Sequence, residues 1–385
     1  MQPMDKRLSN QQGMTYRPCG LNVTVSIPRV VAEVSSGRCW YPDILRFSTG
    51  ELMLNHSVNA DSNENTSNAQ AVYLSRGGGA TFDFAYDVNG FHNGGGEPRL
   101  SLPDGRIVGT SSFLKPDPPG QARIFAAHRW TYDHGGRRYT VEPWGARVDG
   151  LPRDVLPYPN PSRTCWSRIN WFSDIVPLDD GTWVTTISPH FSGDSLESTV
   201  AVSSRDEGRH WQYLSIVGDS GDVAGAKEGF DEPCLIRLDS GELLCISRVG
   251  SGADQPLARS YSADGGRSWS PIDRLPAFSV APQLCRLRNG AIMLGTGRPG
   301  LFLWCSADAR GEQWQSIDLM AHHNAMVGRW SMIAEQTTAY TALVEVAPNR
   351  VFLVYDRTPL GWGLLPADSG ERSQIWLVEV SIVQA

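Results

Sequence analysis

One structural unit recurs along this sequence: a short apolar strand, a turn, and a second short apolar strand. The turns use dipeptides such as Asp-Gly, Asn-Gly and Ser-Gly, which β-hairpins favour because the backbone needs a positive φ there. Six such hairpins occur, at residues 41–57, 97–112, 172–188, 232–248, 281–298 and 340–357. Regular repetition of this kind restricts the chain to architectures built from repeated antiparallel sheets.

A short motif, Ser-x-Asp-x-Gly-x-x-Trp, follows several of the hairpins. It appears as SRDEGRHW at 204–211 and SADGGRSW at 262–269, and one residue longer as SADARGEQW at 306–314. After the first hairpin, SRGGGATF at 75–82 lacks the aspartate. The aspartate can accept backbone N–H groups within its own turn, and the tryptophan can fill the space between neighbouring sheets. We therefore interpret the motif as structural.

Six units of about four short strands predict an all-β fold, a six-bladed β-propeller with four-stranded antiparallel blades. The last unit has only three strands and ends in a strand at 374–382. The apolar stretch at 21–31 is predicted to complete this blade and thereby close the ring. Residues 21–385 are expected to form a single propeller domain, and residues 1–20 an N-terminal extension.

The charge of the chain argues against several classes of partner. Its formal net charge is −7 and its sequence pI about 5.6, so no basic stripe is available to neutralise the phosphates of a nucleic acid or a membrane surface. No segment is apolar and long enough to insert into a membrane. No Gly-x-Gly-x-x-Gly motif opens a helix, and no metal-ligand spacing occurs. We expect no cofactor and no metal, and seven cysteines present as free thiols.

The N-terminal residues lack the apolar core of a secretory leader. The sequence as given therefore predicts a cytoplasmic protein, whereas earlier removal of a leader would suit a secreted or periplasmic one.

Polar side chains gather where chemistry is expected. In a propeller, the first strand of each hairpin begins, and the second ends, at the same mouth of the central channel. These positions hold, among others, Tyr41, Glu97, His56, Glu232, Arg248, Arg298, Tyr340, Asp356 and Arg357. Two arginines that face one pocket predict an acidic ligand. A tyrosine needs a nearby base to act as a nucleophile at neutral pH, because its pKa is about 10.

These stretches resemble the sialidase (neuraminidase) superfamily, and the octapeptides resemble its Asp-boxes, also called BNR repeats. EPCLIRLDSGELLCISR matches the blade that carries the family's glutamate and second arginine, here Glu232 and Arg248. GTGRPGLFLWCSAD matches the third arginine, Arg298, and AYTALVEVAPNRVFLVYD the nucleophilic tyrosine, Tyr340. The resemblance implies a covalent glycosyl–tyrosine intermediate with retention of configuration.

Three features depart from the family pattern. In CWYPDIL, Trp40 stands where the family has its first arginine, and Arg38 is two residues away. Asp61 matches the family's acid/base aspartate by location alone. His56 and His92 are rival general acids, because a histidine pKa lies near neutrality. Glu97 is expected to line the channel, and Trp40 could stack on a sugar.

The sequence therefore predicts a sialidase-like glycoside hydrolase that removes a terminal acidic sugar, sialic acid or a related one, from a glycan. Tyr340 and Glu232 would form the nucleophile pair, with Arg248, Arg298 and Arg38 as the carboxylate clamp. Two alternatives remain open: a glycosidase or lyase that uses His56 or His92 on glycans containing uronic acid, and a glycan-binding propeller without catalysis.

Overall fold

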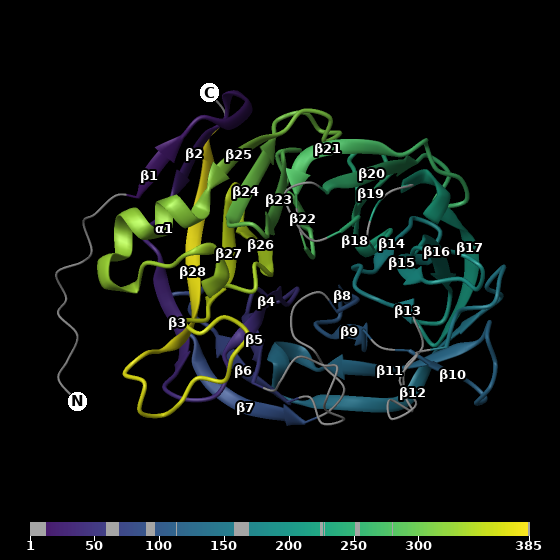
Figure 1. The fold of residues 1–385 in the computed structure, drawn as a ribbon, viewed down its shortest axis with the longest axis horizontal. Helices are drawn as coiled ribbons and strands as arrows, with labels where there is room; N and C mark the ends of the chain where they lie inside the picture. The colour runs from purple at the N-terminus through teal and green to yellow at the C-terminus, as the bar shows by residue number, and fades with distance from the viewer. Residues whose placement is uncertain are drawn as a thin grey trace.

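The structure is a computed structural model that describes residues 13–58, 69–89, 97–112, 114–157, 169–223, 226, 228–250, 255–278 and 280–383 (Figure 1). These residues form an all-β fold whose sheets are mostly antiparallel, as predicted. In Figure 1 the sheets follow one another around the centre of the view.

Three sheets have four strands each, with antiparallel neighbours and sequential order. The first contains β4 (Trp40–Arg46), β5 (Leu52–Ser57), β6 (Ala69–Ser75) and β7 (Asp83–Asn89). The second contains β18 (Asp231–Arg237), β19 (Leu243–Arg248), β20 (Pro256–Ser262) and β21 (Asp273–Phe278). The third contains β22 (Gln283–Arg286), β23 (Ile292–Gly297), β24 (Leu301–Ser306) and β25 (Gln315–Asp318). Each corresponds to one predicted hairpin and the strands that follow it.

The second and third hairpin units share a ten-stranded sheet. Its strands are β8 (Arg99–Ser101), β9 (Ile107–Thr110), β10 (Lys115–Pro116), β11 (Phe125–Tyr132), β12 (Tyr139–Asp149), β13 (Ile169–Asn170), β14 (Val176–Pro177), β15 (Trp183–Pro189), β16 (Thr199–Ser204) and β17 (His210–Gly218). A parallel pairing of β12 with β17, through Arg147–His210, Val148–Trp211 and Asp149–Gln212, joins two antiparallel runs. The described residues thus form five sheets rather than the six separate blades predicted.

The last sheet contains both ends of the described chain. Its strands are β1 (Met14–Tyr16), β2 (Asn22–Val25), β3 (Arg29–Val34), β26 (Thr341–Ala347), β27 (Arg350–Arg357) and β28 (Ser373–Val383). Both β2 and β3 pair with β28 in antiparallel register, for example Val23 with Ile382 and Val30 with Trp376. The prediction that the N-terminal segment completes the last unit is confirmed, although this segment forms two strands instead of one.

The first strands of neighbouring hairpins meet around the centre. β26 contacts β4 and β22, and β22 also contacts β18. The one α-helix of the described chain, α1 (Leu319–Val327), follows β25, and Asp318 caps it by accepting the N–H of Ala321 at 2.8 Å. Short 3₁₀ turns lie at Pro18–Gly20, His134–Gly136, Ser220–Val223, Gly328–Trp330 and Ala334–Gln336. Because the first strands converge, residues from distant hairpins can share one site.

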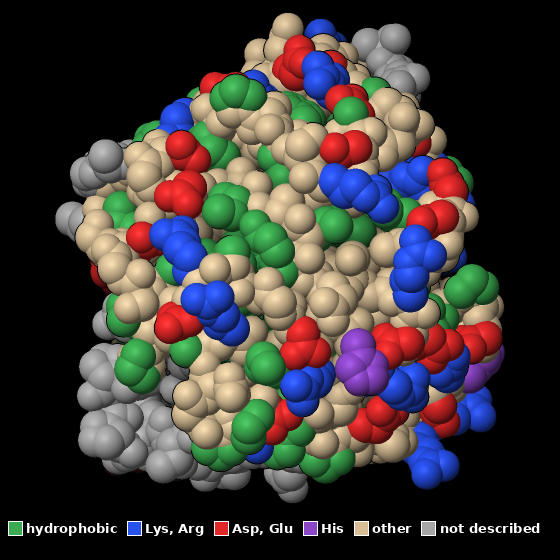
Figure 2. Space-filling view, turned by 90° about the vertical axis from the view of Figure 1, so that its right-hand side faces the viewer, with side chains coloured by type: hydrophobic (Ala, Val, Ile, Leu, Met, Phe, Trp, Pro, Cys, Tyr) green, Lys and Arg blue, Asp and Glu red, His purple; other side chains and the backbone are tan. Residues whose placement is uncertain are grey.

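Charged side chains of both signs are mixed on the surface. On the face shown in Figure 2, Lys and Arg side chains alternate with Asp and Glu. Among the described residues, ion pairs such as Arg205–Asp180 and Arg209–Glu142 join surface side chains of opposite charge. In the described chain, no helix is long and apolar enough to cross a membrane, and no group of three or more His, Cys, Asp or Glu could hold a metal ion. The described cysteines are free.

In the octapeptide turns, the aspartate and the tryptophan of the motif make the contacts expected from the sequence. Asp206 accepts the backbone N–H groups of Arg209 and His210 at 3.1 and 2.9 Å. Trp211 is fully buried, donates its indole N–H to the carbonyl of Gly208 at 2.9 Å and packs edge-on against Trp171. Asp264 and Asp308 bind the backbone of their own turns in the same way. These side chains stabilise the turns and the inter-sheet core.

We predict that Trp211→Ala lowers the free energy of unfolding by about 3–5 kcal/mol, because it empties a fully buried indole volume. Trp362, which is 45% exposed, provides the matched control: Trp362→Ala should change stability by less than about 1 kcal/mol. Urea denaturation measures both values, and equal losses in the two variants would contradict this structural role of the octapeptide.

Candidate active site

The centre of the site is a contact between Tyr340 and Glu232. Tyr340 directly precedes β26, Glu232 lies on β18, and the two are 108 positions apart in the sequence. The Tyr340 hydroxyl donates a hydrogen bond to Oε1 of Glu232. Glu232 is only 5% exposed, whereas Tyr340 is partly exposed. The predicted pair is therefore brought together, with the tyrosine on the accessible side.

The second oxygen of Glu232 is also engaged. Its Oε2 accepts the backbone N–H of Ala281 at 2.6 Å and lies 3.0 Å from Nη1 of Arg248. Three neighbouring units thus meet at a single carboxylate. The first contributes Glu232 itself and Arg248, the second contributes Ala281, and the third contributes Tyr340. A buried charge requires such pairing, because an unpaired carboxylate is costly away from water.

The backbone at the start of the first strands is unusual. Tyr41, Glu232 and Ala281 open the first strands of their hairpins with φ of 51°, 41° and 39°. Side-chain-bearing residues rarely adopt such left-handed conformations, which persist where the surrounding structure enforces them and which concentrate at functional sites. The register shifts that begin β4 and β18 lie at the same places. Tyr41 and Glu232, at these two places, both contact Tyr340.

The local electrostatics indicate which of the two residues, Tyr340 or Glu232, carries the shared proton. Burial raises the pKa of the Glu232 carboxyl, but the charge of Arg248 and the hydrogen bonds from Tyr340, Arg248 and Ala281 outweigh burial and hold this pKa below its usual value. Burial and the negative charge of Glu232 raise the pKa of Tyr340 well above its usual value. In the resting site the phenol is thus neutral and the carboxylate ionised. This is the arrangement that a nucleophile and its base require.

The two predicted clamp arginines are differently placed. Nη2 of Arg248 lies 2.6 Å from Oε2 of Glu228, so this guanidinium bridges Glu228 and Glu232. Arg298 donates from Nη2 to the carbonyl of Thr338 at 3.0 Å, and its Cζ lies 5.9 Å from the ring centre of Tyr340. Both predicted arginines therefore border the Tyr340–Glu232 pair.

An aromatic cluster borders Tyr340 on its other side. Tyr41 meets Tyr340 edge-on at 4.7 Å between ring centres, and Trp40 and Trp362 lie 5.1 and 5.9 Å from Tyr41. Trp40 and Trp362 are 5.5 Å apart. Trp40 is 1% exposed and Trp362 45%. The sequence did not single out Trp362, although an indole in the glycine-rich stretch 358–371 was a signal for an exposed binding residue.

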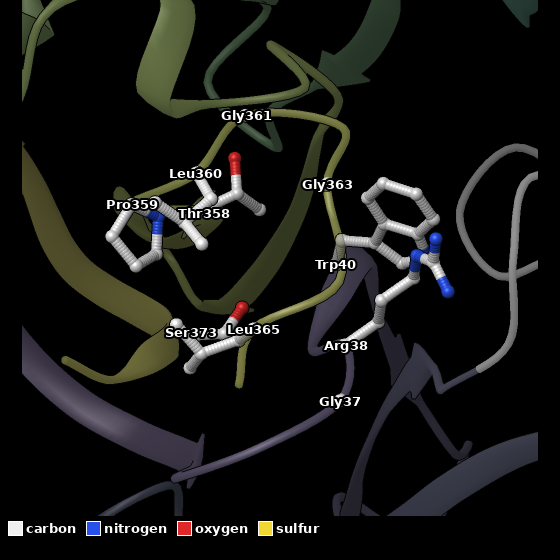
Figure 3. Close-up of a pocket in the computed structure, with 10 residues that line it drawn as sticks. All are labelled: Gly37, Arg38, Trp40, Thr358, Pro359, Leu360, Gly361, Gly363, Leu365 and Ser373. Atoms are coloured by element: carbon white, nitrogen blue, oxygen red, sulfur yellow. The ribbon is translucent and has the colours of Figure 1, made fainter. Parts of the chain in front are cut away.

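Arg38 does not approach the Tyr340–Glu232 pair through any contact that the structure records. Its guanidinium lies 5.0 Å from the ring of Trp40, and Figure 3 shows it beside this indole. The two residues line a pocket with Thr358, Pro359, Leu360 and other residues of the following loop (Figure 3). The pocket volume of about 10 Å³ leaves space for roughly one water molecule.

Asp356 organises the segment that carries Tyr340. Its carboxylate accepts hydrogen bonds from the Thr337 hydroxyl and the Thr338 N–H, both at 2.8 Å, from the Thr338 hydroxyl, and from the Tyr41 N–H at 3.1 Å. Asp356 is fully buried at the end of β27. It therefore ties the start of β4, at Tyr41, and the segment that precedes β26 to one carboxylate. The sequence analysis placed Asp356 at the mouth but gave it no role.

The remaining predicted residues are dispersed. His56 is fully buried, stacks on Tyr73 at 5.7 Å, and has its pKa lowered by burial to about 4. A neutral histidine enclosed in this way is poorly suited to donate a proton to a substrate. Glu97 is 3% exposed just before β8, and its carbonyl accepts from Arg99 at 3.3 Å. Asp61 and His92 lie outside the described residues.

We predict that Asp356→Ala lowers the free energy of unfolding by about 3–5 kcal/mol, since it leaves several buried donors without an acceptor. Asp368→Ala, at an exposed aspartate, should cost less than about 0.5 kcal/mol. Urea denaturation compares the two. A stability loss in Asp356→Ala no larger than in the control would show that Asp356 does not organise the segment.

A pH effect is expected from Asp231, whose pKa is raised to about 6 by burial and by the negative charge of Glu232. Between about pH 4 and pH 6 the folded state binds this proton more strongly than the unfolded state, so stability should fall as pH rises through this window. Asp231→Asn should weaken this fall in the free energy of unfolding. An unchanged pH profile would contradict the assignment, and Asp368→Asn is the control.

Comparison with known proteins is consistent with this geometry. Residues 173–353 match the family described as BNR repeat-like domain. Among curated proteins, none matches the chain in sequence. A protein of unknown function from Dyadobacter fermentans has a similar structure, with a TM-score of 0.69, 16% identity, and coverage of 94% of this chain and 99% of that one.

Two glycosidase structures are also similar in fold. The Hadza microbial sialidase Hz136 gives a TM-score of 0.59 at 13% identity, over 88% of this chain and 65% of the other. The α-L-arabinanase of Penicillium chrysogenum, complexed with arabinobiose, gives 0.58 at 15% identity, over 94% and 98%. The family match and the similarity of fold support the predicted resemblance to the sialidase-like superfamily.

Proposed function

We propose that the protein is a glycoside hydrolase that releases a terminal sugar from a glycan with retention of configuration. The observation that carries the proposal is the hydrogen bond from a neutral, partly exposed Tyr340 to an ionised, buried Glu232. A purely glycan-binding protein has no need for a nucleophile–base pair. The similar structures include a sialidase and an α-L-arabinanase, so glycosidases of both names share this fold.

In the first step, Tyr340 Oη attacks the anomeric carbon while its proton passes to Oε1 of Glu232, and the bond to the leaving oxygen breaks. The leaving oxygen needs a proton, for which Asp61 is our candidate donor by its place in the sequence. In the second step, water attacks the anomeric carbon of the glycosyl–tyrosine and gives its proton to the carboxylate of the same candidate, Asp61, which the first step left ionised. The tyrosine oxygen leaves and recovers its proton from Glu232, which regenerates the pair.

The surrounding groups would assist both steps. Arg248, 3.0 Å from Glu232, keeps this carboxylate ionised until it takes the proton. Arg298 lies beside the Tyr340 ring and lowers the cost of the negative charge that develops on the phenol oxygen. Asp356 acts as a positioning residue, because it holds Thr337, Thr338 and the Tyr41 backbone.

We also propose that the six hairpin units act as six blades around one axis. The parallel pairing of β12 with β17 would then be an edge contact between two blades. On this arrangement the Tyr340–Glu232 pair lies at one mouth of the central channel.

The histidine-dependent alternative is the less favoured one. His56 is enclosed and neutral in the described structure, which leaves this lyase-like chemistry without an accessible proton donor at that position. A glycan-binding role without turnover is retained as an outcome of the following test.

We predict that Tyr340→Phe reduces turnover about a thousandfold or more, because it removes the attacking oxygen and keeps the ring that packs on Tyr41. Glu232→Gln should also be severely impaired, since an amide cannot accept the phenol proton. Sugar release would be measured on a panel of α-sialosides, α-L-arabinosides, uronic-acid-capped glycans and other neutral glycosides. Far-UV circular dichroism and thermal unfolding verify that both variants are folded.

Full activity in folded Tyr340→Phe would overturn the nucleophile assignment. Glycan binding without release of any sugar by the wild-type protein would leave a recognition module instead of an enzyme. Activity that survives Tyr340→Phe and is lost in His56→Ala would favour the histidine-dependent alternative.

A further inference from the structure

The charge around Arg248 bears on which sugar the site accepts. Its guanidinium is already paired with two carboxylates, Glu228 at 2.6 Å and Glu232 at 3.0 Å, and Asp231 adjoins Glu232. Arg248 itself is almost completely buried, with only 8% of its surface exposed. A substrate carboxylate that approached Arg248 would have to displace Glu228 or meet two fixed negative charges at close range. In a site of reduced polarity, such repulsion is costly.

The position expected for another arginine is filled by apolar surface. Trp40 is 1% exposed and packs against Tyr41 and Trp362. Arg38, the nearest cationic side chain in sequence, stacks on Trp40 and borders a pocket of only about 10 Å³. A three-arginine clamp is therefore not formed by Arg38, Arg248 and Arg298.

Trp362 instead presents a partly exposed aromatic side chain that is separated from Tyr340 by one ring, that of Tyr41. Its indole is 45% exposed and lies 5.2 Å from Cζ of Arg298. Tyr41 connects it to Tyr340, with ring-centre distances of 5.9 Å to Trp362 and 4.7 Å to Tyr340. Leu360 and Leu364, on the same loop, are 51% and 59% exposed. Aromatic surface of this kind packs against the C–H face of an uncharged sugar ring.

The loop that presents Trp362 is anchored. Backbone hydrogen bonds join Gly37 and Leu365 in both directions, at 2.9 and 3.2 Å, and Thr358 N–H donates to the carbonyl of Gln336 at 2.8 Å. Arg357, just before the loop, pairs with Glu371 at its far end, at 3.2 Å. The exposed indole is thus held in place at both ends of its loop, as a binding surface requires.

We propose that this site takes a sugar without a carboxylate group, with its ring or that of the adjoining sugar stacked on Trp362. The inference rests on the proposed function, because it assigns a substrate class to the same Tyr340–Glu232 site. It replaces the acidic sugar expected from the sequence.

The first test compares paired aryl glycosides that differ only in charge, such as a glucoside and the matching glucuronide, together with an α-sialoside and an α-L-arabinoside. The wild-type protein should show kcat/KM about tenfold or more higher for its best uncharged substrate than for any acidic one. Preference for an acidic substrate, with turnover that depends on Tyr340, would overturn the inference and leave the proposed function intact.

The second test uses variants. Trp362→Ala should raise KM about tenfold on uncharged oligosaccharides with little change in kcat on a minimal aryl glycoside. Phe84→Ala, at an aromatic side chain on β7 that is 57% exposed, is the matched control and should leave both constants unchanged. Glu228→Gln removes one of the two carboxylates at Arg248, and should raise kcat/KM for acidic relative to uncharged substrates severalfold.

A binding experiment distinguishes a failure of the substrate-class inference from a failure of the proposed hydrolase function. Calorimetry with an uncharged and an acidic oligosaccharide would be carried out on Tyr340→Phe, with and without Trp362→Ala. Binding of the uncharged glycan that needs Trp362, in a protein that releases no sugar, would support the substrate class and reject the hydrolase. Identical KM values in wild type and Trp362→Ala, or no change of preference in Glu228→Gln, would count against the inference.

Discussion

The pairing of β2 and β3 with β28 is the constraint on which the rest of the structure depends. It joins the two ends of the described chain through main-chain hydrogen bonds, and the last sheet is thereby held next to the first. β26 then contacts β4, and Tyr340 meets Tyr41. Without this long-range closure, which local sequence preferences do not enforce, the site would lack one of its walls.

Within the site, Glu232 is the residue on which the other contacts depend. One carboxylate accepts from Tyr340 and Ala281 and pairs with Arg248, so three units meet at a single charge. Such a buried group is stable only when all partners are present, because each missing partner leaves a desolvated charge or donor. The same partners lower the pKa of Glu232 and raise that of Tyr340. Structural need and chemical role therefore coincide at this residue.

The aromatic cluster occupies the place where the sequence resemblance implies an arginine. Trp40 lies there instead and packs against Tyr41 and Trp362. Arg38 is drawn onto the outer side of this indole, and Arg248 is balanced by Glu228 and Glu232. On our proposal this arrangement favours ring stacking over charge recognition, while the Tyr340–Glu232 pair is kept.

Sequence periodicity and turn chemistry alone determined the hairpins and the octapeptide turns around Asp206, Asp264 and Asp308. These features depend on interactions between residues close in sequence or on alternating burial, which a repeat displays directly. The meeting of Tyr340 with Glu232 was also expected, because the propeller prediction places the starts of the first strands at one mouth.

Only the tertiary structure decided how side chains share partners across units. The parallel contact of β12 with β17, the pairing of Arg248 with Glu228, the enclosure of His56 and the exposed indole of Trp362 depend on packing between segments far apart in the chain. Sequence spacing gives the end of a strand but neither the rotamer of its side chain nor the neighbour that neutralises it. For that physical reason, the contact between Tyr340 and Glu232 could be predicted from the sequence, whereas the balance between charge and aromatic surface around it could not.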